Sequence, residues 1–458
     1  MENKPLTQEI SNTNISYKPS STDWDSIFRI TELINKSIHF IDKNLVGRKE
    51  VIKQSFYAIL TGEHQLLIGR TGMAKSLLAR QILGCFDKVS VFEKQLTKDT
   101  MPDNLFGMYD METMKKGKLF HNVEGSIVLA DFAFIDEIFD ANDMLLRSLL
   151  SLLNEKRLVN GEQIVESSLN TVISAANYIR VTDVLEAVID RFLYKSYIPE
   201  DKSLYYQVNI DMIYKNNVGN IAIPYSKIKL HELVELKKLI KGKDIEIPDF
   251  ILFIKNYILK QYIHRNRRSR QENSTFTISD RTSAKTQNLL KASALLAGRK
   301  EVSIDDLDNL HYLICTIGKE DEIKELKMIV DEAKQRFKHD LKVLNILGYL
   351  LRSFNEFQDE EKRKLIIEDT EWKKNLLTIR NDLGESPTFM EKVKDMVNMI
   401  IHPRATEIAE IIILFKEMCE LLKKEVHHSE ILSFIVDFEK DINQVYLKNI
   451  GASNNLTN

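Results

Sequence analysis

The sequence predicts an α/β protein in which a parallel sheet carries helices on both faces, followed by two mainly helical regions. Short apolar runs at Gln65–Ile68, Val89–Phe92, Phe132–Ile135 and Thr171–Ala175 alternate with helical patterns at Leu77–Leu83 and Met144–Leu153. Such alternation is typical of strand–helix units in a parallel sheet. After about residue 200 the pattern is mainly helical, and Ser303 with Asp306 forms a capping box that opens a helix expected through Leu307–Ile317.

The predicted organisation has four parts. Residues 1–24 are rich in Ser, Thr and Asn and are expected to form a disordered arm. The α/β domain is expected at 25–200, an all-α region at 201–320, and a second helical module at 321–458. In that module glycine and proline are rare, and apolar residues recur at three- and four-residue spacing.

Composition excludes several classes of protein. The 458 residues are 43% hydrophobic and 29% charged with a net charge of -3, which argues against a surface devoted to nucleic acid or anionic lipid. Cys85, Cys315 and Cys419 have no metal-ligand spacing, and an odd number fits no closed set of disulfides. The polar N-terminus and the absence of a long uncharged apolar stretch predict neither a signal peptide nor a membrane span, and the expected compartment is the cytoplasm.

The strongest motif is a phosphate-binding loop between a predicted strand and a predicted helix, Gly69-Arg70-Thr71-Gly72-Met73-Ala74-Lys75-Ser76. A phosphate group needs backbone N–H groups at a helix N-terminus and a nearby cation. Lys75 is expected to contact the β- and γ-phosphates, and the Ser76 hydroxyl to ligate Mg²⁺. Ala74 stands where the simplest pattern has a second glycine, and a small residue is tolerable there if its φ is negative, since only a methyl group is added.

An acid pair follows the predicted strand Phe132–Ile135. Asp136 is expected to hold Mg²⁺ through water and Glu137 to polarise the attacking water. The alternative is a buried strand that ends in two solvated acids. The position of the pair, downstream of a phosphate-binding loop, favours the catalytic interpretation.

Two further polar positions fit the same chemistry. Asn177 follows the strand Thr171–Ala175 and is expected to orient the lytic water, the alternative being an ordinary loop asparagine. In Asp190-Arg191-Phe192, Arg191 is expected to reach the γ-phosphate held by a neighbouring subunit. The alternative for Arg191 is a salt bridge at the end of a helix.

Taken together, these motifs resemble the AAA+ ATPases, within them the MoxR family, and most closely its RavA-like branch. Leu45-Val46-Gly47-Arg48 resembles the segment that borders adenine, and Pro102–Gly107 the start of the insert in helix 2. Leu158–Ser167 resembles the pre-sensor hairpin, and Ser279-Asp280-Arg281 the start of the lid helix that carries the sensor 2 arginine, Arg281. The resemblance covers about residues 30–320, and Arg70-Thr71 stands where family members carry two prolines.

The resemblance implies a ring, most often a hexamer, that hydrolyses ATP with Mg²⁺ and remodels or activates a protein client. A partner with a von Willebrand A domain is implied in the same way, and residues 201–320 would be the lid. The implied nucleotide-binding residues are Val46, Gly69, Arg70, Thr71, Gly72, Met73, Ala74, Lys75, Ser76 and Leu77, with Ser76 and Asp136 at the metal and Glu137, Asn177, Arg191 and Arg281 in catalysis.

Two other functional classes stay open. A nucleic-acid motor or a restriction-type subunit would use the four arginines in His264–Arg270 as a contact site, although such a run is more often a solvated segment. An ATP-gated assembly scaffold would bind nucleotide with little turnover. The intact acid at Glu137 argues against the scaffold.

Overall fold

The computed structural model describes residues 23–178, 189–200, 203–217, 224, 227–269, 278–316, 318–359, 361–363, 370–383 and 404–454. The arm expected at 1–24 lies almost entirely outside these residues. The chain divides into two compact units, Met1–Ile247 with Asn273–Met328 and Pro248–Glu272 with Ile329–Asn458. No helix of the described residues is long and apolar enough to cross a bilayer.

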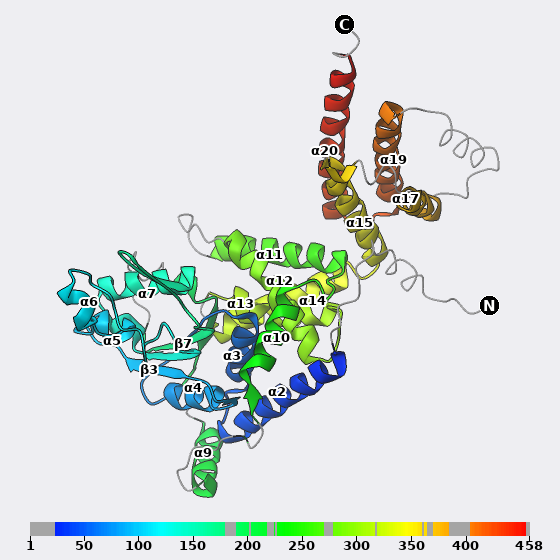
Figure 1. Cartoon of the computed structure of the whole chain (residues 1–458). Helices are drawn as coiled ribbons and strands as arrows, with labels where there is room; N and C mark the ends of the chain where they lie inside the picture. Colours follow the sequence, from blue (N-terminus) through cyan, green and yellow to red (C-terminus); the bar gives the residue numbers. More distant parts are fainter. Residues whose placement is uncertain are drawn as a thin grey trace. The chain divides into compact units, whose positions relative to one another are not determined.

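Five parallel strands form the central sheet of the first unit, in the order β3-β4-β7-β1-β8 (Figure 1). Their bounds are β1 Gln65–Ile68, β3 Val91–Gln95, β4 Phe132–Asp136, β7 Thr171–Ala176 and β8 Tyr194–Tyr197. The predicted parallel sheet is thus confirmed. β3 begins later than expected, because the Ser90 N–H turns to the Asp131 carboxylate. β8 was not predicted, since Lys195 interrupts its apolar pattern at the sheet edge.

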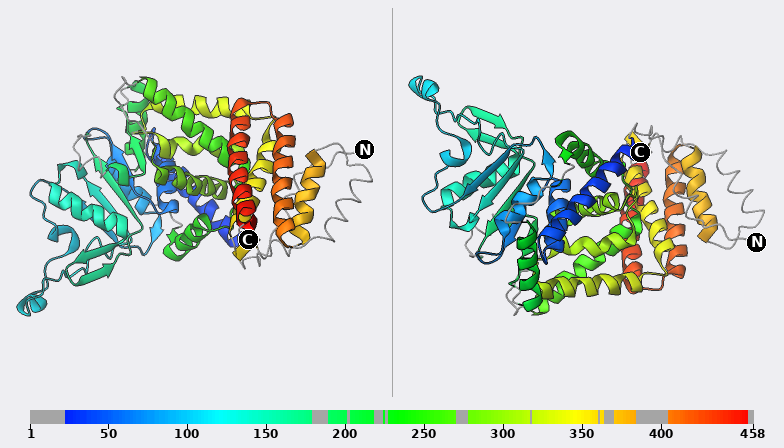
Figure 2. Two further views of the ribbon diagram at one scale, coloured as in Figure 1. Left: turned by 90° about the horizontal axis from the view of Figure 1, so that it is seen from above. Right: turned by 90° about the horizontal axis from the view of Figure 1, so that it is seen from below.

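Helices cover both faces of this sheet. Alternate strand residues, among them Leu66, Ile68 and Ile135, pack in one apolar cluster with Leu145 and Leu149 of α7 (Asp143–Glu155). Figure 2 shows α7 lying along the strands. The other face carries α3 (Lys49–Thr61) and α4 (Lys75–Leu83), and there the rings of Phe56, Phe86 and Phe132 pack together. The three-layer arrangement therefore follows from strands that are apolar on both sides.

Further elements complete the first unit. They are α2 Trp24–Asn44, β2 Phe86–Asp87, α5 Asp103–Phe106, α6 Met111–Lys115, η1 Ile138–Asp140, β5 Arg157–Asn160, β6 Gln163–Glu166, α9 Leu204–Asn217, β9 Ile228–Lys229, α10 Leu230–Lys241, α12 Asp280–Leu296, η2 Ile304–Leu310 and α13 His311–Ile314. β5 and β6 form the expected antiparallel hairpin. The capping box at Ser303 is confirmed, but it opens a 3₁₀ helix, and the helical path ends at Cys315 in extended backbone.

The second unit is entirely helical in its described residues. It contains α11 Asp249–Ser269, α15 Leu341–Gln358, α17 Thr370–Leu383, α19 Arg404–Glu425 and α20 Ser429–Asn454, and the division falls within α14 Glu320–Arg336. Phe354 packs edge-to-face on Phe415 of α19 and Phe438 of α20. α11 belongs to this unit because the ring of Phe253 packs on Phe337 and Phe434. The division therefore does not coincide with the boundary predicted at residue 320.

Candidate functional site

The loop Gly69–Ser76 joins the carboxyl end of β1 to α4, as predicted. A Cβ at Gly69 would lie 3.0 Å from Cβ of Ile198 and 3.1 Å from the Ile198 carbonyl oxygen, so a larger residue would fit only if Ile198 moved by a few tenths of an ångström. Gly72 has φ +85°, in the left-handed region. Ala74 also has φ +58°, so the condition of a negative φ, under which alanine would fit there without strain, is not met. The loop needs a left-handed residue immediately before α4, which costs an alanine roughly 1–2 kcal/mol.

Lys75 is buried at the first position of α4. Its Nζ donates to the carbonyl oxygens of Gly69 (2.5 Å) and Arg70 (3.1 Å) and to Oδ1 of Asn177 (2.7 Å). Burial lowers the pKa of Lys75, whereas Glu137 and Asp136 act to raise it. The first N–H groups of α4 have no acceptor within the helix, and they lie at the positive end of its dipole. This corner therefore suits a phosphate group.

Ser76 and Asp136 meet beside the lysine. Ser76 Oγ donates to Asp136 Oδ2 at 3.1 Å, and Asp136 Oδ1 accepts the N–H of Glu137 at 3.0 Å. A hydroxyl and a carboxylate held together are the oxygen donors that Mg²⁺ prefers. The residues present thus fit the metal that the sequence predicts for this position.

Glu137 and Asn177 are in direct contact. The Asn177 amide donates to Oε1 of Glu137, while its oxygen accepts from Lys75. Burial, and then the neighbouring Asp136, raise the pKa of Glu137, which brings the acid closer to the range useful for a general base. Because β1, β4 and β7 are neighbours in a parallel sheet, the residues that follow them meet at one edge.

The outer residues of the loop are less enclosed. Arg70 is exposed and pairs with Glu200 at 3.1 Å, and Thr71 is exposed as well. Met73 and Leu77 are half-buried in the loop and the first turn of α4. Val46 is also half-buried, and next to it a Cβ on Gly47 would lie 3.0 Å from the Tyr206 ring of α9.

Arg191 and Arg281 are not brought to the loop of their own chain. Arg191 precedes β8, whose Tyr194 pairs with Gln65, and it therefore lies at the amino end of the sheet. There it forms the salt bridge with Asp190 at 3.0 Å that the alternative interpretation had named. Arg281 is exposed in the first turn of α12, and one turn later Lys285 pairs with Glu63, which precedes β1.

One contact near the site was not predicted from the sequence. The Tyr178 hydroxyl donates to Asp140 Oδ1 at 2.6 Å and ties the residue after Asn177 to the 3₁₀ turn that follows Glu137. The only available signal was its position next to Asn177. A cluster of lysines at the opposite end of β1 was missed as well, because its members come from separate segments.

Two family models match the chain. Residues 32–206 match the MoxR domain of MoxR–vWA–beta-propeller ternary systems, and residues 246–330 match an AAA lid domain. A solved crystal structure from Cytophaga hutchinsonii, named as a candidate ATPase, shares the fold. Its TM-score is 0.53 at 19% identity, over 68% of this chain and 96% of that one. The predicted α/β fold with a helical lid is thereby confirmed.

The chain is also similar to several other proteins. Two uncharacterized proteins of Methanocaldococcus jannaschii are 29% and 26% identical, over 69% and 81% of this chain and 82% and 92% of their own lengths. The chaperone MoxR1 of Mycobacterium tuberculosis is 25% identical over 39% of this chain and 48% of its own length. The MoxR-domain match, the lid-domain match and the similarity to MoxR1 agree with the family resemblance seen in the sequence.

Proposed function

With the MoxR family of AAA+ proteins as the premise, we propose that this chain hydrolyses ATP with Mg²⁺ and uses the energy to remodel or activate a protein client. The observation that carries the proposal is the connected set of Lys75, Asn177 and Glu137, with Ser76 and Asp136 beside it. Ser76 and Asp136 would hold the metal, which supplies charge neutralisation on the phosphates. Lys75 would bind the terminal phosphates, Asn177 would orient a water, and Glu137 would take its proton.

We propose a ring, by resemblance a hexamer, because the catalytic set is divided between the two ends of the sheet. The phosphate loop lies at the carboxyl end, whereas Arg191 and Arg281 lie toward the amino end. Neither arginine is close to the loop of its own chain. In a head-to-tail assembly, one copy would offer both arginines to the nucleotide of the next, where such a cation is worth about 10³-fold or more in rate.

The helix-2 insert and a neighbouring hairpin form one protrusion, and we propose that a client binds there. The helix-2 insert and the hairpin β5–β6 are tied together by an ion pair between Lys118 and Glu162 (2.6 Å) and by hydrogen bonds between His121 and Gln163. Its exposed apolar side chains are Met108, Met111, Met114, Leu119, Val159 and Ile164. Figure 2 shows α6 at the tip of this extension. Flexible methionines suit a surface that accepts varied sequences.

The finer assignments remain proposals. A von Willebrand A-domain partner is supported by the matched model, which describes systems of that kind. The RavA-like branch stays a prediction from the sequence alone. For the nucleic-acid alternative, Arg265 pairs with Glu332 at 2.5 Å and is therefore partly neutralised, and Arg270 lies outside the described residues. Intact Glu137 and its contact with Asn177 favour turnover over a scaffold role.

The test is a client assay on the full chain. ATP hydrolysis and suppression of aggregation of an unfolded model protein are measured for wild type and for the double variant Met111→Ser with Met114→Ser. The proposal expects unchanged basal hydrolysis and a loss of client stimulation, because only exposed contacts change. Met328→Ser, at another exposed methionine, is the matched control. Client stimulation that survives in the double variant would show that the protrusion is not the client-binding surface. Absence of ATP hydrolysis in wild type would contradict the proposed function as a whole.

A further inference from the structure

A pocket of about 490 Å³ opens at the amino end of the sheet, opposite the phosphate loop. Its wall consists of Gly62, Lys156, Asn170, Val234, Lys237, Lys238, Lys241 and Gly242. Four of these eight residues are lysines, and they come from the end of α7 and from α10. The volume lies in the range of small-molecule sites. Neither the motifs nor the proposed ATP chemistry accounts for this concentration of cations.

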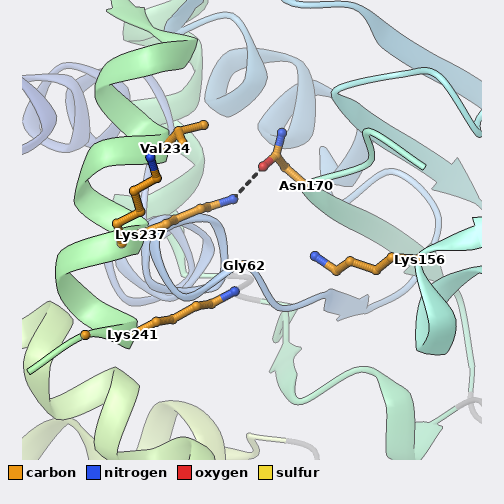
Figure 3. Close-up of a pocket in the computed structure, with 8 residues that line it drawn as sticks. Gly62, Lys156, Asn170, Val234, Lys237 and Lys241 are labelled. Atoms are coloured by element: carbon orange, nitrogen blue, oxygen red, sulfur yellow. Dashed lines mark hydrogen bonds between the residues drawn. The ribbon is translucent and has the colours of Figure 1, made fainter. Parts of the chain in front are cut away.

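The amino groups of these lysines converge on one place. Figure 3 shows Lys156, Lys237 and Lys241 pointing into the space beside Gly62. A Cβ on Gly62 would lie 3.4 Å from Nζ of Lys241 and 3.7 Å from Nζ of Lys237, so both nitrogens lie close to the same point. Gly62 has φ +70°, in the left-handed region that favours glycine. Because glycine has no side chain, this point stays free.

The cluster has little compensating negative charge. Lys237 is only 9% exposed, and its Nζ donates to the neutral amide oxygen of Asn170 at 2.9 Å. Glu63 is the nearby carboxylate, and it is paired with Lys285. Within the described part of the chain, no acid stands in ion-pair contact with Lys156, Lys237 or Lys241.

We propose that this lysine pocket binds a small multivalent oxyanion of the phosphate class. Two ammonium groups close to one point, with Lys156 directed toward them, supply the donors that such an anion requires, and the burial of Lys237 strengthens its charge-assisted bond. A free phosphate or pyrophosphate and the phosphate tail of a nucleotide share this chemistry. The pocket is separate from the proposed nucleotide site of its own chain, because Gly62 and Gly69 lie at opposite ends of β1.

Binding at this pocket should depend on pH. Burial first, and then Lys156 and Lys241, lower the pKa of Lys237 to about 7, while Glu63 acts to raise it. The other charged groups facing the pocket are Lys238 from α10 and, from α12, Lys285 beside Glu63. An anion needs the protonated lysine, so affinity should rise as the pH falls through 7. Sulfate is the probe for this measurement, because its charge stays constant across the range.

The experiment uses the full chain with Lys75→Ala, which removes phosphate binding at the loop. Calorimetric titration of pyrophosphate should show saturable binding that weakens roughly tenfold or more in Lys237→Met and in Lys241→Met, since each loses a charge-assisted bond. Lys243→Met, an exposed lysine just outside the pocket, should stay within about twofold by the same reasoning. Lys241 is exposed, so its variant remains informative if Lys237→Met does not fold.

Displacement of pyrophosphate by ATP would identify the nucleotide tail as a source of the anion. Failure of ATP to displace it would identify free phosphates. Both outcomes support anion binding in the pocket. Sulfate binding that tightens between pH 8.5 and 6.5 would support it further. The proposal is overturned if the Lys75→Ala chain shows no saturable binding. It is overturned equally if the pocket variants bind like Lys243→Met.

Discussion

The two ends of strand β1 carry two buried lysines in opposite surroundings. At the carboxyl end, Lys75 meets the Asn177 amide, and Glu137 and Asp136 raise its pKa against the effect of burial. At the amino end, Lys237 meets the Asn170 amide, but its charged neighbours are chiefly other lysines, which lower its pKa further. The first cation is balanced within the chain, and the second depends on charge from outside. Burial alone therefore does not show whether a lysine needs an external anion. The charges around Lys75 and Lys237 distinguish these two lysines.

The largest expected effect concerns the cations at the amino end. Arg191→Ala should lower ATP hydrolysis by about 10³-fold with little change in nucleotide affinity, because a finger stabilises charge in the transition state. Steady-state hydrolysis and binding of a fluorescent nucleotide measure the two quantities. Mixing this variant with Glu137→Gln, each inactive alone, should restore part of the activity. No rescue in mixed assemblies of confirmed size would contradict the assignment of Arg191 to a neighbouring site.

Glu137→Gln tests the carboxyl end. The amide keeps the contact with Asn177 but cannot accept a proton, so turnover should fall roughly a hundredfold or more while ATP binding persists. Hydrolysis of ATP and equilibrium binding are compared with wild type. Asp140→Asn, which alters a nearby acid without removing the proposed base, is the matched control. Wild-type turnover in the Gln variant would exclude Glu137 as the base.

Lys237→Met should stabilise the chain in the absence of anions by about 2 kcal/mol at pH 7, since a buried charge is removed and one hydrogen bond is lost. The pKa of Lys237 is lowered in the folded chain to about 7. Its protonation therefore destabilises the fold fully below pH 7 and progressively less as the pH rises toward the ordinary lysine pKa. Thermal unfolding at pH 7 and pH 10 should show a larger gain at pH 7. An equal gain at both values would mean that packing, and not charge, causes it.

The smallest expected effect is that of Ala74→Gly. Glycine relieves the left-handed strain at φ +58° but adds freedom to the unfolded chain, so the net gain in stability should be about 1 kcal/mol or less. Chemical denaturation of the two proteins without nucleotide measures it. A loss of more than about 1 kcal/mol in Ala74→Gly would show that the methyl group contributes packing which outweighs the strain.

The contrast between the two ends also explains what the sequence could predict. Lys75, Ser76 and the acid pair follow predictable strands at short spacing, so pattern and topology together indicated a common edge. The lysine pocket draws on Gly62, Lys156 and Lys237, whose proximity depends on how α3, α7 and α10 pack. No local pattern contains that information. The positive φ of Ala74 could not be predicted for a related reason, because residue type alone does not fix the conformation of a loop.

The division of the chain has a practical consequence for dissecting the protein. Because α11 is grouped with the helices after residue 329, the polypeptide passes between the two units three times, and no single cut separates them. Ending the chain at Lys319 would keep α11 while deleting Phe337 and Phe434, on which its Phe253 packs. The expected product is an aggregation-prone fragment, because the apolar side of α11 would be exposed to solvent. A clean excision removes 248–272 as well, and exchange of this unit between relatives requires two simultaneous grafts.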